Sequence, residues 1–181
     1  MVLRDLGHQP VEEVGAEALP APLQRLLSGA RGRRCDDGWS AYALGALVLV
    51  AGPPAVELRL VEAWGDGRVP EPVAEVSRVH DGVGPPGVPR APFGTPRLLP
   101  VARMAPLTQW MRFGEEGILY APADWLRFSV DPVGGFCVST RGEVRHWSQH
   151  DHCLGPLVPW RGVWGALVAG WKRAASVSLP S

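Results

Sequence analysis

The 181-residue chain is poor in cysteine and in long apolar runs. Its three cysteines, Cys35, Cys137 and Cys153, are an odd number at wide spacing, which excludes a disulfide framework and a Cys-x-x-Cys zinc pattern. The longest apolar run covers residues 41–51, whereas a membrane-spanning helix needs about 20 residues. The first seven residues carry charges and no apolar core, so no secretory signal is expected. These absences predict a cytoplasmic protein without a membrane association.

The chain also lacks an excess of charge of either sign. Lys+Arg and Asp+Glu are 18 each, so the formal net charge is zero. Proteins that bind the phosphates of nucleic acid usually have an excess of basic residues or a strongly basic face. We therefore expect no direct binding to nucleic acid.

Motifs of the common catalytic and cofactor sites are missing as well. The sequence contains no G-x-x-x-x-G-K-[ST] phosphate loop and no H-E-x-x-H pair. Acidic pairs such as Glu12/Glu13 are sequence neighbours, as is typical of solvated surface. Cys137 stands between Phe136 and Val138, where a small core residue is expected rather than a nucleophile. The sequence predicts neither an enzyme nor a bound cofactor.

The amino-acid composition predicts one folded domain over residues 1–181. Leu, Val, Ile and Phe make up about 26% of the chain, above the level at which disorder is expected. Gly 22 and Pro 19 indicate many turns, and the prolines concentrate in a predicted loop over about residues 83–100. Eight tryptophans need a core or a partner to cover them; we expect Trp39 and Trp147 to be the more exposed ones.

Hydrophobic spacing predicts an α+β fold with a mostly antiparallel, mixed sheet and flanking helices. Helices are expected at residues 11–18, 20–29 and 72–82, and strands at residues 39–50 and 56–60. An antiparallel meander follows, with strands at residues 117–120, 125–130, 136–139 and 143–147 and a hairpin turn at residues 131–135. An amphipathic helix closes the chain, because Trp160, Val163, Trp164, Leu167 and Trp171 share one face.

One cluster has the composition of a metal site. His146, His150, His152 and Cys153 lie within eight residues, and imidazole and thiolate are the ligands that zinc prefers. Their spacing fits none of the usual paired-ligand patterns, and a polar loop after a strand explains the same residues. The favoured interpretation is no metal; the alternative is a small metal-binding protein or metal-dependent hydrolase.

The C-terminal third resembles a known family. The run Tyr120 to Phe128, then Asp131-x-x-Gly134-Gly135, then Gly142-x-Val144 and a closing apolar helix are similar to the SUKH superfamily. Upstream, the Leu19-Pro20 start of a leucine-rich helix is similar to that family's Pro-initiated helix. The exit Val79-His80-Asp81-Gly82 is similar to the family's x-x-N-G exit, with Asp81 where Asn is common.

The resemblance implies a non-enzymatic binding fold. Bacterial members of the superfamily include immunity proteins that sit on a co-encoded toxin, often a nuclease or a deaminase, and block its active site. The expected partner of this chain is therefore a cognate protein toxin. A scaffold or regulatory interaction module of the same fold is the alternative within this class.

An acidic segment suggests where such a partner would bind. Residues 57–81 contain six acids against three arginines, together with one tryptophan. An acidic surface with an aromatic anchor could occupy the basic, phosphate-gripping site of a nuclease. Ordinary solvated positions on one strand and one helix explain the same acids. The candidate partner-binding residues are Glu62, Trp64, Asp66 and Glu71.

Overall fold

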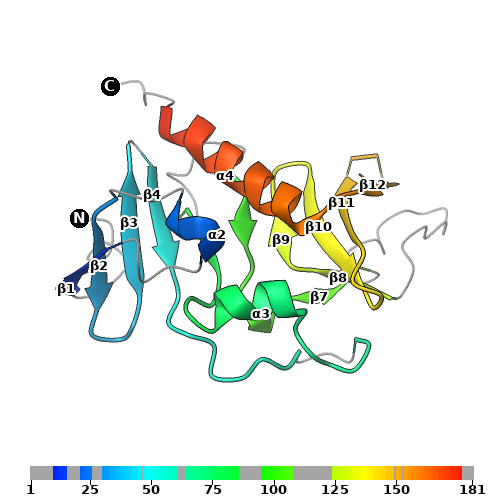
Figure 1. The fold of residues 1–181 in the computed structure, drawn as a ribbon, viewed down its shortest axis with the longest axis horizontal. Coiled ribbons are helices and arrows are strands. Elements are labelled where there is room, and N and C mark those ends of the chain that lie inside the picture. The colour runs from blue at the N-terminus through cyan, green and yellow to red at the C-terminus, as the bar shows by residue number, and fades with distance from the viewer. Residues whose placement is uncertain are drawn as a thin grey trace.

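Two antiparallel sheets with helices packed against them make up the fold (Figure 1). The structure, a computed structural model, describes residues 10–15, 21–25, 30–45, 47–60, 64–85, 95–107, 124–148, 150–151 and 153–176. The helices are α2 (Ala21–Gln24), α3 (Glu71–Ser77), the 3-10 turn η2 (Val101–Arg103) and α4 (Trp160–Ser176). The strands are β1 (Pro10–Val14), β2 (Gly32–Cys35), β3 (Ser40–Leu44), β4 (Leu47–Ala51), β5 (Val83–Gly84), β6 (Arg97–Leu98), β7 (Ala105–Pro106), β8 (Trp125–Arg127), β9 (Ser129–Val130), β10 (Gly134–Ser139), β11 (Val144–Ser148) and β12 (Cys153–Leu157).

The first sheet has the strand order β1-β2-β3-β4-β5-β6-β9. Residues 39–50, where one strand or two short ones meeting near Gly45 were expected, contain the two strands β3 and β4, which pair as a hairpin. Tyr42 in β3 and Leu49 in β4 face each other and are completely buried, so this hairpin supplies one wall of the core. Strand β9, which follows β6 by about thirty residues in the sequence, completes this sheet by pairing with β6.

The second sheet has the order β12-β11-β10-β8-β7 and contains the predicted meander. Strand β10 pairs with β8 on one side and with β11 on the other, as the hairpin turn at residues 131–135 required. The chain leaves this sheet at Phe128 and enters the first sheet one residue later. The Phe128 carbonyl accepts the Leu99 N–H at 2.9 Å, and the Phe128 N–H donates to Phe136 at 3.2 Å, so this residue ties the two sheets together.

Helix α4 lies along both sheets, as Figure 1 shows, and its apolar stripe faces the core. Val163, Leu167 and Trp171 are buried, and burying such a side chain stabilises the fold by about 1.5–3 kcal/mol. The indole N–H of Trp171 donates to the Pro96 carbonyl at 2.6 Å, so its polar atom is satisfied in the core. Trp160 and Trp164 stack on each other and pack against the core, but both are only partly buried, so among the tryptophans of the stripe the expected inward packing is complete only at Trp171.

The α+β class is confirmed, with differences in the arrangement of the strands. The expected single mixed sheet is wrong, since the described strands form two sheets and every pair among them is antiparallel. The expected helix at residues 11–18 is wrong at its start, where β1 pairs with β2. The expected strand at residues 56–60 is also wrong: its alternation lacks a neighbouring strand, and only Arg59 bridges Arg68. The predicted loop at residues 83–100 begins and ends in paired strands, β5 and β6.

Candidate functional site

The segment that leaves α3 holds a buried histidine between two strands of the first sheet. His80 is 1% exposed, and its Nδ1 lies 3.0 Å from the Gly52 carbonyl oxygen and its Nε2 3.0 Å from the Tyr42 hydroxyl. Because a carbonyl only accepts, Nδ1 carries the proton and Nε2 accepts from the hydroxyl. Burial lowers the pKa of His80, and the hydrogen bond to Gly52 offsets this in part. The imidazole is therefore neutral, and it holds the backbone at Gly52 through the hydrogen bond to its carbonyl.

The next residue, Asp81, fixes the backbone of η2. Its Oδ1 accepts the Val101 N–H at 2.7 Å, and its own N–H donates to the Pro53 carbonyl at 3.0 Å. Burial raises the pKa of Asp81, and the N–H of Val101 offsets the increase in part. Gly82 has a φ of +80°, and a Cβ there would lie 2.9 Å from the Pro100 nitrogen, so this position needs glycine.

These contacts shape a groove at one end of the first sheet, where β3 and β5 begin and β4 and β6 end. We call it the Asp81 groove; it has a volume of about 490 Å³. Four segments that are separate in the sequence meet there, and the Gly52 N–H, which donates to the Gly82 carbonyl at 3.2 Å, joins two of them. The lining residues are Trp39, Gly52, Pro53, Pro54, Ala55, Val56, Glu57, Arg59, Asp81, Pro100, Val101 and Ala102.

The acidic residues proposed from the sequence do not form one uncompensated patch. Glu71 receives two hydrogen bonds from the Arg78 guanidinium, at 2.7 and 3.2 Å, which is the main cause that lowers the pKa of Glu71. Asp66 lies 3.5 Å from the Arg68 Nε and accepts the Arg68 N–H. Such exposed pairs add little stability, but they balance the charge locally. Glu62 lies outside the described residues.

Trp64 is not the exposed anchor that the sequence suggested. Its side chain is 6% exposed and belongs to the main hydrophobic core. The expectation for Trp147 is wrong as well, because it packs with Trp125 and Cys137 on the second face of the other sheet. Trp39 is partly buried and lines the Asp81 groove. Of these tryptophans, only Trp39 offers surface to a partner.

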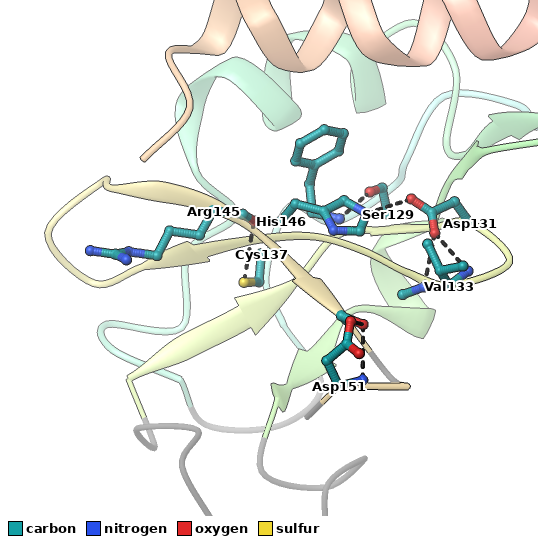
Figure 2. A network of polar contacts seen from close by, with 10 residues as sticks. Ser129, Asp131, Val133, Cys137, Arg145, His146 and Asp151 are labelled. Atoms are coloured by element: carbon teal, nitrogen blue, oxygen red, sulfur yellow. Dashed lines mark hydrogen bonds and ion pairs between the residues drawn. The ribbon is translucent and has the colours of Figure 1, made fainter. Parts of the chain in front are cut away.

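The described residues of the proposed metal cluster lie in different places, and Figure 2 shows one of them, His146, beside Asp131. The His146 Nε2 lies 2.6 Å from Asp131 Oδ2, across the hairpin, whereas His150 contacts Asp151 in an exposed turn at 3.2 Å. Cys153 is an exposed residue of β12, and His152 lies outside the described residues. Within the described part of the chain, no three His, Cys, Asp or Glu side chains come together as a metal site would require. This arrangement does not favour the metal alternative.

Asp131 instead organises the hairpin on which the family resemblance rests. One carboxylate oxygen accepts the N–H groups of Val133 and Gly134 at 3.0 and 2.8 Å, and the other bonds to His146. Burial raises the pKa of Asp131, but the His146 bond and the two backbone donors outweigh it, so the net shift is downward. A Cβ on Gly134 would collide with the Trp147 carbonyl oxygen, which explains the glycine at this place.

The remaining candidates for chemistry are held in the interior. Burial raises the pKa of Cys137 to about 12, so its thiol is protonated and unreactive at neutral pH, as expected for a core residue. Arg127 is buried with its guanidinium 6.0 Å from the Trp147 ring centroid, and burial lowers its pKa to about 10. At pH 7 this arginine is still charged. Its burial was not expected from the sequence, because a buried arginine is rare.

Comparisons with known proteins add no relative. Searches with protein-family models, among curated proteins and among solved structures found no match to this chain. In the described parts of the chain, no helix has the length and apolar character needed to cross a bilayer.

Proposed function

We propose that this chain is a SUKH-like immunity protein that neutralises a co-encoded toxin by covering the toxin's active site. The proposal is carried by the hydrogen bonds of two aspartates, Asp131 and Asp81, in the motifs that are similar to the SUKH superfamily. Asp131 bonds to the backbone of its own turn, and Asp81 bonds to the backbone of η2. In both motifs the carboxylate therefore holds the backbone of a turn in place. This structural role is the one expected in a binding fold.

The electrostatics of the described side chains give further support. A nucleophile or a general base needs an accessible group with a suitably shifted pKa. Here the pKa of Cys137 is shifted away from reactivity, and both nitrogens of His80 are occupied in the core. The Asp81 groove, by contrast, is open and largely apolar, and such surfaces are typical of partner recognition.

The test is neutralisation of the toxin encoded in the neighbouring reading frame. The toxin is expressed in a host with and without this chain, and growth is measured together with binding of the two purified proteins by calorimetry. We expect growth to be restored and a complex with 1:1 stoichiometry to form. A neighbouring toxin that neither binds the chain nor loses activity would contradict the proposal and favour an interaction module of another kind.

A matched control separates neutralisation from general effects of expression. Gly134→Val places a branched side chain against the Trp147 carbonyl, so the hairpin cannot form. This variant should be unfolded by circular dichroism and should not restore growth. Protection by the unfolded variant would show that the rescue does not come from the folded protein.

A further inference from the structure

The Asp81 groove combines an apolar wall with acidic groups. The wall is formed mainly by Pro53, Pro54 and Val56, which follow β4 without entering a strand. Val56 is 105% exposed, the highest value among the large hydrophobic residues that the structure describes. A single exposed valine is common on protein surfaces. In the lining of this groove, Val56 adds apolar surface to that of the prolines and Trp39.

The charge of the groove is negative. Its lining contains Glu57 and Asp81 against Arg59, and neither acid forms an ion pair with any described residue. The adjacent turn adds two exposed acids, Asp36 and Asp37. This turn lies against the wall, because a Cβ on its glycine, residue 38, would be 2.9 Å from the Pro53 Cβ.

The Asp81 carboxylate has capacity for another donor. Its Oδ1 is occupied by the Val101 N–H, whereas Oδ2 makes no hydrogen bond to a described residue. The group is half-buried at the groove, so water screens it less than it screens a fully exposed acid. A cationic donor that reaches Asp81 would gain a charge-assisted hydrogen bond.

We propose that the Asp81 groove receives an arginine side chain of the partner protein, with its methylene stem on the proline wall and its guanidinium between Glu57 and Asp81. An arginine fits both features, because its stem is apolar and its planar head pairs with carboxylates and stacks on aromatic rings such as Trp39. A groove of about 490 Å³ accommodates one long side chain with its flanking backbone. This inference rests on the proposed function, and it moves the acidic recognition surface away from Asp66 and Glu71.

The direct test uses a short peptide with a central arginine, acetyl-Gly-Leu-Arg-Leu-Gly-amide. Its matched control carries citrulline, which has nearly the same shape as arginine but no charge. Amide chemical shifts of the ¹⁵N-labelled chain are followed during titration with each peptide. We expect the arginine peptide to shift the amides of Gly52, Ala55, Val101 and Ala102, and the citrulline peptide to bind about tenfold more weakly. Equal binding of the two peptides, shifts elsewhere or no shifts would overturn the proposal.

Two conservative variants test the assigned carboxylates. Asp81→Asn retains an oxygen that accepts the Val101 N–H, so the groove should keep its shape while it loses the charge. Glu57→Gln changes an exposed side chain. Each should weaken binding of the arginine peptide about three- to tenfold, whereas Glu75→Gln, an exposed acid of α3 outside the groove, should not. A loss that is as large for Glu75→Gln would overturn the assignment.

The same variants distinguish failure of this inference from failure of the proposed function. If the parent chain neutralises the toxin and the Asp81→Asn/Glu57→Gln double variant binds it with unchanged affinity, the groove proposal is wrong and the immunity function stands. If the arginine peptide binds the groove but no toxin is neutralised, the immunity function is wrong and the groove assignment stands.

Discussion

Lowering the pH through the range below about 6.5 should weaken the fold through His80. Burial lowers the pKa of this imidazole in the native chain, whereas in the unfolded chain the ring titrates near 6.5. Below that pH the unfolded chain binds more protons than the native one, so the free energy of unfolding falls as the pH falls. Above that range both states are neutral at this residue, and it contributes no pH dependence.

The size of the effect follows from the burial of the ring. One group contributes at most about 1.4 kcal/mol per pH unit. His80 is 1% exposed, and protonation of Nε2 would place a charge in the core and lose the hydrogen bond from the Tyr42 hydroxyl. Between pH values of about 7.5 and 5.5, we expect a loss of up to about 1.4 kcal/mol from this residue.

The assay is urea unfolding, followed by tryptophan fluorescence at several pH values. His80→Phe retains an aromatic ring but leaves the Tyr42 hydroxyl and the Gly52 carbonyl without the bonds described here, at about 1–3 kcal/mol each. This variant should lose the pH dependence between about 5.5 and 6.5. Tyr42→Phe should cost about 1–3 kcal/mol and keep it.

Two results would refute this reasoning. One is an unchanged pH dependence in His80→Phe, which would assign the effect to another group. The other is a nuclear magnetic resonance titration of the native chain in which the His80 ring protonates near its ordinary pKa. The second measurement needs no variant, so the prediction remains testable if His80→Phe does not fold.

Three further predictions concern α4 and the thiols. Trp171→Ala should lower the free energy of unfolding by about 3–5 kcal/mol and Trp164→Ala by clearly less, because only the former is fully buried; equal losses in urea titrations would contradict this. Gly165→Ala should raise it by about 0.5–1 kcal/mol, because the position is helical and exposed and a Cβ there meets nothing within 4 Å; an unchanged denaturation midpoint would contradict the open space. In the native chain at neutral pH, a thiol reagent should modify Cys153 rapidly and Cys137 only after unfolding, as mass mapping of the modified residues would show.

Local sequence patterns predicted those elements whose hydrogen bonds or apolar repeat lie within a short stretch of the chain. The turn at residues 131–135 is one, because Asp131 bonds to the N–H groups two and three residues later. Helix α4 is another, since its stripe repeats over four turns. In both cases the residues that determine the element are close together in the sequence.

The errors arose where distant residues decide the outcome. Residues 11–14 are a strand because β2 lies beside them, whereas the pairing of residues 56–60 is limited to one isolated bridge between Arg59 and Arg68. The acidic segment at residues 57–81 suggests that its tryptophan, Trp64, is an exposed anchor, but the ring packs in the core. The Asp81 groove could not be predicted, since its lining comes from four separate segments, none of which shows by itself that it meets the others.

The crossing of the chain at Phe128 has a consequence for the order in which a growing polypeptide acquires its binding surface. Every residue that lines the Asp81 groove has been synthesised once Ala102 is made. Strand β6, which leads directly into the Pro100–Ala102 side of the groove, nevertheless pairs with β9, and β9 is made almost thirty residues later. A nascent chain that ends before Val130 thus carries all the lining residues without the strand that completes the edge of their sheet. We therefore expect the groove to reach its final shape late in synthesis, after β9 has paired with β6.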